Sequence, residues 1–261
     1  MLPASLVLVL ASLLLAELAA SPALAFDPPT YNATVWKAFA AKTLLTPFPE
    51  LHTDPYEASP PINTTWPAVP VCAVVYPNEP DRSSYKLATF PTRAAAEAAP
   101  ATFVTHLHPC GLCSTTQDLA VYMAKPDLTD PVRKCGLETA FDKKLALDCL
   151  LDIGFSKPCA QIWMYDAINS FKHCLEPCIK AWIEHTPNNV PPNSYNMNPC
   201  LACDQEKSGP VFRVVAARIR RDSGLRSSIN RPPSSIANIT HYYIERKKLL
   251  EKSSFSLDFL L

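Results

Sequence analysis

Ten cysteines lie between residues 72 and 203, and this clustered, even set constrains the fold more than any other feature of the chain. An even number allows five disulfide bonds with no thiol left over. Disulfide bonds persist in oxidising compartments, chiefly in secreted proteins. The sequence therefore predicts a secreted, extracellular domain that is held together by disulfides.

The start of the chain favours the same compartment. Residues 6–16 form an apolar run, and Ala23-Leu24-Ala25 fits the small-residue pattern of a signal-peptide cleavage site. The run is shorter than the roughly 20 residues of a membrane span. We expect residues 1–25 to be a signal peptide and Phe26 to be the first residue of the mature protein.

Three Asn-x-Thr sequons flank the cysteine block, at Asn32, Asn63 and Asn238, and none falls inside it. N-glycans are bulky and require exposed chain. Together with the predicted signal peptide, the sequons predict a glycoprotein with sugars on its flanks.

Composition divides the mature chain into three parts. Residues 26–69 are rich in proline, which disfavours helix interiors and central strands, so we expect an extended arm. Residues 70–222 form the predicted cysteine-rich domain. Residues 223–261 are polar at first and then charged, and they predict a loosely ordered tail. From Asp204 onward eleven Lys and Arg face six Asp and Glu, so this end of the chain is basic.

Local patterns predict an α+β fold that is mainly helical. Short strands are expected at 69–76, 85–90 and 102–106, with a helical turn at 92–99, forming a small N-terminal β element. Ser114-Thr115-Thr116-Gln117 predicts the start of a helix that continues to about Ala124. Residues 129–131 predict a helix cap, and helical spacing then recurs over 137–153, 159–183 and 210–222, which predicts a disulfide-stapled helical bundle.

The two longest predicted helices meet at Gly154, which favours an antiparallel hairpin. Counting outward from this turn predicts disulfides between Cys149 and Cys159 and between Cys135 and Cys174. Cys178 is expected to reach another element, at Cys200 or Cys203, and the partner of Cys72 stays open.

The helix predicted at 159–183 carries a broad apolar stripe, which we interpret as core. Its members are Ile162, Trp163, Ile168, Phe171, Leu175, Ile179 and Trp182. Pro177 falls within it and predicts a kink or restart.

The sharpest enzymatic alternative is Cys110-Gly111-Leu112-Cys113, between a predicted strand and a predicted helix. A thiolate there would be stabilised by the helix N-terminus, as in a thiol oxidoreductase. The local order is similar to the start of a thioredoxin-like fold, but Pro109 replaces the usual aromatic residue and the later strands are missing. We therefore interpret both cysteines as structural.

Two further readings of these residues are weaker. The same cysteines faintly resemble a papain-type site, with Cys113 as nucleophile and His241 as base, but the flanking residues depart from that pattern. Zinc binding by His106, His108 and the Cys-x-x-Cys pairs competes with disulfide formation, which an oxidising compartment favours. We predict no metal and no cofactor.

Arg218-Ile219-Arg220-Arg221 matches the pattern that furin-type convertases cleave. Cleavage after Arg221 would release the basic tail. The alternative, a charged helix face, is the interpretation we prefer.

Several motifs together resemble a family of secreted, cysteine-rich eukaryotic proteins of unknown function, over residues 70–225. They are Cys110-Gly111-x-Cys113-Ser114, Gln117-Asp118-Leu119-Ala120-Val121-Tyr122, Pro158-Cys159-Ala160-Gln161-Ile162-Trp163, Cys200-x-x-Cys203-Asp204 and Ser208-Gly209-Pro210-x-Phe212. The resemblance implies a shared architecture and carries over no activity.

The sequence thus favours a non-enzymatic binding or extracellular structural module, whose partner would be an extracellular protein, glycan or lipid surface rather than nucleic acid. A thiol oxidoreductase using Cys110 and Cys113 is one alternative. Lipid or membrane-surface binding by the helical hairpin is the other, and it shares a weak similarity with saposin-like domains.

Overall fold

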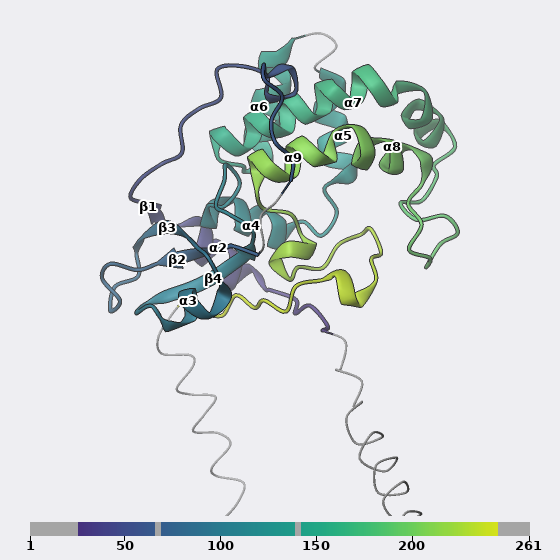
Figure 1. Cartoon of the computed structure of the whole chain (residues 1–261). Helices are drawn as coiled ribbons and strands as arrows, with labels where there is room; N and C mark the ends of the chain where they lie inside the picture. Colours follow the sequence, from purple (N-terminus) through teal and green to yellow (C-terminus); the bar gives the residue numbers. More distant parts are fainter. Residues whose placement is uncertain (1–25, 66–68, 139–141, 245–261) are drawn as a thin grey trace, which may run out of the picture.

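The computed structural model describes residues 26–65, 69–138 and 142–244 (Figure 1). The predicted signal peptide lies outside these ranges. The fold is α+β: a small sheet lies at one end of the molecule, and most of the helices pack together at the other. Within the described residues, no helix is both long enough and apolar enough to cross a membrane.

The sheet has four strands in the order β1-β3-β2-β4. The central strand β2 runs antiparallel to both β3 and β4, and the two-residue strand β1 runs parallel to β3. The strands are β1 (Thr43–Leu44), β2 (Val71–Val75), β3 (Ser84–Phe90) and β4 (Thr102–Leu107), and the short helix α3 (Arg93–Ala98) connects the last two. β2, β3 and β4 lie at the three predicted positions.

Side-chain caps fix several helix starts, because they satisfy the free amide groups of the first turn. Thr115 accepts a hydrogen bond from the Asp118 amide at the start of α4, and Asn198 accepts one from the Leu201 amide at the start of α8. The helices besides α3 are α2 (Ala33–Ala40), α4 (Thr116–Ala124), α5 (Thr129–Glu138), α6 (Lys143–Ile153), α7 (Lys157–Ile183), α8 (Pro199–Lys207) and α9 (Gly209–Ala216). Short 3₁₀ turns form at η1 (Pro55–Glu57), η2 (Arg221–Ser223) and η3 (Pro233–Ser235).

α6 and α7 meet at Gly154, as predicted. Gly154 has a φ of 114°, a left-handed conformation that only glycine adopts without strain, and it ends α6. α7 is kinked at Cys174, three residues before Pro177. Proline removes one helical hydrogen bond and crowds the preceding turn, so the kink has an identifiable cause.

The disulfide pairing predicted from the hairpin is wrong. Cys135 lies on α5 and bonds to Cys149 on the next helix, α6, because Asp142 caps a separate helix where the sequence suggested a continuous one. Cys159, in the first turn of α7, bonds instead to Cys113 before α4. The remaining bridges are Cys72–Cys110, Cys174–Cys203 and Cys178–Cys200, and all ten cysteines are bonded.

The flanks pack on the domain rather than extending from it. In the N-terminal part, α2 begins at the cap Asn32 and buries Phe39, although a proline-rich arm without helix was expected. In the C-terminal part, Leu225, Ile239 and Tyr243 are buried, so the loosely ordered tail predicted from 223 is wrong for residues 223–244. The ring centroids of Phe39 and Tyr243 lie 5.2 Å apart, so both ends of the described chain share one core. Aromatic burial outweighs the loop-like composition of these segments.

Candidate functional site

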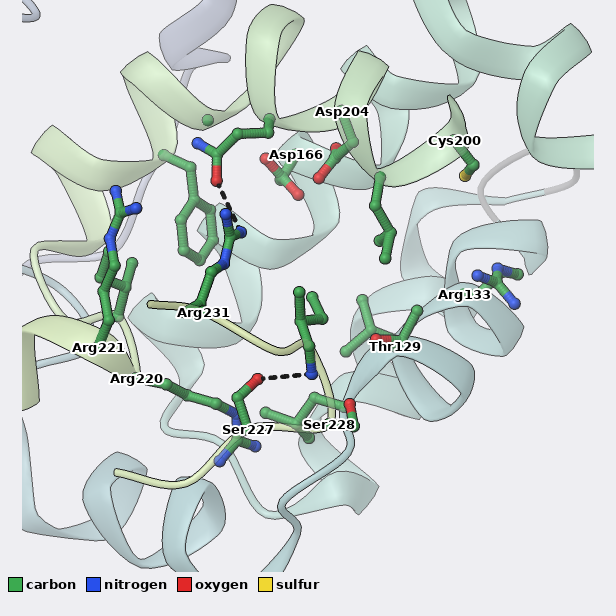
Figure 2. A pocket seen from close by; sticks show the side chains of 18 of the residues that line it. Thr129, Arg133, Asp166, Cys200, Asp204, Arg220, Arg221, Ser227, Ser228 and Arg231 are labelled. Carbon is green, nitrogen blue, oxygen red and sulfur yellow. Dashed lines mark hydrogen bonds between the residues drawn. The ribbon is translucent and has the colours of Figure 1, made fainter. Parts of the chain in front are cut away.

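A pocket of about 690 Å³ opens between α5, α7, α8, α9 and the segment 225–236 (Figure 2). We call it the α7 pocket. Its apolar lining includes large aliphatic and aromatic side chains: Phe26, Tyr122, Leu128, Val132, Leu137, Trp163, Phe171, Leu175, Ile179, Trp182, Leu201, Phe212, Ile219, Leu225, Ile229 and Ile236. Pockets of about 300–1,000 Å³ with mainly apolar walls and a few polar groups are typical of small-molecule sites.

One wall is a row of four side chains on α7: Phe171, Leu175, Ile179 and Trp182, which we call the α7 stripe. Their spacing of four, four and three residues places them on one helix face. They are 39–56% exposed, whereas Ile162, in the same apolar pattern, is fully buried. The interpretation of the whole pattern as core is therefore wrong for its second half. Around and beyond the kink at Cys174, two disulfides hold α8 beside α7 while the stripe faces the pocket.

The facing wall comes from the segment 225–236, which sequence composition assigned to the tail. It is held in place by backbone and side-chain hydrogen bonds. The Asn230 amide donates to the Asn189 side chain at 2.8 Å, and that side chain donates back to the Asn230 carbonyl at 3.2 Å. The Ser228 amide donates to the Pro126 carbonyl at 3.2 Å. Sequence reasoning missed this wall because its anchors lie about 40 to 100 residues away.

Arginines gather along one side of the pocket. Arg221 lies 3.7 Å from the Asp222 carboxylate, and Arg213 lies 3.4 Å from the same group. Arg231 donates a hydrogen bond of 3.3 Å to the neutral side chain of Gln205. Burial and the neighbouring positive charge of Arg221 lower the pKa of Arg231. Arg221 and Arg213 thus share the Asp222 carboxylate, and among the described residues no ion pair joins Arg231 to a carboxylate.

Two carboxyl groups, Asp166 on α7 and Asp204 on α8, line the same pocket and lie close together in Figure 2. Tyr56 donates a hydrogen bond of 2.7 Å to Asp166, and Ser170 donates one to Asp204. Burial, followed by the neighbouring Asp204, raises the pKa of Asp166 well above its usual value. Burial also raises the pKa of Asp204. Both shifts favour neutral carboxyl groups over charged ones at the pocket wall.

The Arg-x-Arg-Arg motif lies neither on a helix face nor in an accessible loop. Arg218 is fully buried and donates hydrogen bonds to the backbone carbonyls of Cys113, Thr105 and Ser114. Arg220 donates to the carbonyls of Tyr122 and Lys125. Convertases bind their targets as extended, exposed segments, so the folded chain does not present this motif.

Cys110 and Cys113 do not bond to each other, and each forms a bridge to a distant cysteine. A thiol oxidoreductase cycles its Cys-x-x-Cys pair between dithiol and disulfide, which this pairing excludes. A bridged Cys113 is also no papain-type nucleophile. Its supposed partner His241 is fully buried, and burial with the nearby charge of Arg218 lowers its pKa to about 3. The bridged cysteines likewise offer no thiolates to zinc.

The Nε2 atom of His106 lies 2.7 Å from the Ser114 hydroxyl, the separation expected of a nucleophile and its base. Both side chains are fully buried, and neither lines the α7 pocket. The Gly111 amide donates to the same hydroxyl at 2.8 Å. A substrate could not reach this pair, which instead joins β4 to the turn before α4.

The three sequon asparagines Asn32, Asn63 and Asn238 are all exposed. The Asn32 side chain accepts a hydrogen bond of 3.1 Å from the Val35 amide at the start of α2. Glycans at these positions would project from the surface.

Residues 143–239 match a family of unknown function (DUF8771). The match runs from α6 through α9 and includes the segment 225–236, so it spans most of the pocket wall. No curated protein and no solved structure shows significant similarity to the chain. These results fit an uncharacterised cysteine-rich family and assign no activity to the chain.

Proposed function

We propose that this protein is an extracellular binding protein that holds a small, elongated apolar ligand, such as a lipid acyl chain, in the α7 pocket. The observation that carries the proposal is the α7 stripe: four large apolar side chains that stay 39–56% exposed inside a pocket of about 690 Å³. Leaving such surface in water is unfavourable by roughly 25 cal/mol per Å². A ligand that covers it recovers this free energy.

The five disulfides support a binding role because they stiffen the walls. Cys174–Cys203 and Cys178–Cys200 fix α8 to α7 on either side of Pro177, next to the stripe. A rigid site loses less conformational entropy when it binds. Disulfides also agree with the proposed secretion, as do the apolar leader sequence and the exposed sequons.

Binding can be measured with a neutral, apolar fluorophore such as N-phenyl-1-naphthylamine, whose emission rises in apolar surroundings. We expect saturable binding to the wild-type protein. Ile179→Glu should weaken it about tenfold or more, because a carboxylate in the apolar wall must lose its water.

Ile183→Glu is the matched control. Ile183 lies one turn further along α7 and is 66% exposed, but it does not line the pocket. Its replacement should leave the affinity unchanged. Equal effects of the two substitutions, or no saturable binding to the wild type, would refute the proposed function.

A further inference from the structure

Arg221 and Arg231 line one side of the α7 pocket, on the segment that follows α9, and Arg133 lies on the side away from Arg221 (Figure 2). The α7 stripe contributes an apolar wall. A ligand that lies along the α7 stripe and reaches these two arginines would meet hydrocarbon along its chain and guanidinium groups at its end.

Within the described part of the chain, ion pairs do not fully balance the positive charge of this end. Among the described residues, Arg231 has no carboxylate partner, and its hydrogen bond goes to the neutral Gln205. Asp222 is shared between Arg221 at 3.7 Å, Arg213 at 3.4 Å and the His108 ring at 3.4 Å. A half-buried guanidinium beside another positive charge costs free energy unless an anion joins it. A ligand anion would supply that partner.

We infer that Arg221 and Arg231 form a subsite for the anionic head group, a carboxylate or a phosphate, of an amphipathic ligand whose chain lies along the α7 stripe. The inference rests on the proposed function, since it names the class of ligand for the same pocket. Guanidinium groups bind both kinds of oxyanion through paired, charge-assisted hydrogen bonds.

Three ligands with the same chain test this inference: dodecanoic acid, dodecyl phosphate and 1-dodecanol, each displacing the neutral fluorophore below its micellar concentration. Wild-type protein should bind the acid or the phosphate at least tenfold more tightly than the alcohol. The tighter of the two anions identifies the head group. Added salt should lower the affinity for the two anions and leave the affinity for 1-dodecanol unchanged.

Arg231→Gln and Arg221→Gln should each remove most of this preference and leave the affinity for 1-dodecanol unchanged. Arg231→Lys keeps the charge without the planar fork and should have an intermediate effect. Arg93→Gln is the matched control: Arg93 is exposed on α3, outside the pocket, and should behave as wild type.

The outcomes separate the two proposals. If the alcohol binds the wild type as tightly as both anions, the subsite is refuted and the apolar pocket stands. If none of the three displaces the fluorophore and the fluorophore itself does not bind, the proposed function fails and the subsite fails with it. Because the comparison among ligands uses wild-type protein, a variant that does not fold leaves the test intact.

Discussion

The hydroxyl of Tyr56 donates a hydrogen bond of 2.7 Å to the Asp166 carboxylate, which lies 110 residues later in the chain. Tyr56 belongs to the short turn η1 and Asp166 to α7, so this bond holds the N-terminal segment against the helix that lines the pocket. The same hydroxyl lies 3.2 Å from the Ser208 carbonyl. One tyrosine thus connects η1, α7 and the junction of α8 and α9.

Tyr56→Phe removes the donor and leaves a buried carboxyl group with one partner fewer. We expect the free energy of unfolding to fall by about 1–3 kcal/mol, the usual effect of leaving a buried polar group without its hydrogen-bond partner. Chemical denaturation measures it. The control Tyr195→Phe concerns a tyrosine that is 53% exposed, and it should change stability by less than about 0.5 kcal/mol. Equal changes would show that the hydrogen bond contributes nothing.

The disulfide pairing predicts a definite peptide map. Non-reducing digestion should give a peptide pair containing Cys113 and Cys159, and none in which Cys110 is bonded to Cys113. Replacing Cys113 and Cys159 together by Ala should lower stability by about 4 kcal/mol, since their loop spans 46 residues. The matched pair Cys135 and Cys149 closes a loop of 14 and should cost about 3 kcal/mol. A Cys110–Cys113 bridge in the native protein would contradict the structure.

What the sequence predicted well was local. The start of α4, the end of α6 at Gly154 and the break near Pro177 each depend on a few neighbouring residues, and each is found, although Thr115 rather than Ser114 caps α4. Cysteine pairing depends on which helices become neighbours in space. Asp142 caps a second helix where one long helix was expected, and this places Cys135 opposite Cys149. Pairing cysteines by their equal distance in sequence from Gly154 therefore fails.

The pocket could not be predicted for a related reason. Helical spacing identified the apolar residues Phe171 to Trp182 but not whether another element would cover them. The residues that face them lie about 20 to 60 positions later in the chain, around Leu201 and Ile229, and they cover the stripe only in part. Partial coverage is a property of the assembled fold and leaves no signal in the periodicity of α7.

The buried position of Arg218 predicts resistance to processing. A furin-type convertase should leave the native protein intact and cut it after Arg221 once it is reduced and denatured, as mass spectrometry of the fragments would show. Arg218→Gln should lower the free energy of unfolding by about 3 kcal/mol, because several buried carbonyls lose their charged donor. Native cleavage at a rate similar to that of the denatured chain would contradict this placement.

Glycosylation can be separated from helix capping at Asn32. In a eukaryotic secretory host, Thr34→Ala removes the sequon but keeps the Asn32 cap, whereas Asn32→Gln removes both. We expect the same gain in gel mobility from both variants and an additional loss of about 1 kcal/mol of stability from Asn32→Gln, since its cap bonds the Val35 amide. Unchanged mobility in both would show that this sequon carries no glycan.

The pH dependence of stability should reveal Asp118, the buried carboxyl group at the start of α4. Burial raises its pKa to about 6, against the opposing effects of hydrogen bonds from Thr115 and Ser156. Between about pH 4 and pH 6 the folded protein therefore holds a proton that the unfolded chain has released. By linkage, the free energy of unfolding falls as pH rises through this window, by up to about 3 kcal/mol for a shift of this size.

Asp118→Asn has no proton to release, so its stability should decline less across the same window. The exposed control Asp152→Asn should keep the wild-type slope. Asp166 and Asp204 are present in all three proteins, so they contribute equally to each slope and do not affect the comparison. Urea denaturation at closely spaced pH values measures the slopes, and a slope for Asp118→Asn equal to that of the wild type would show that Asp118 titrates alike in the folded and unfolded states.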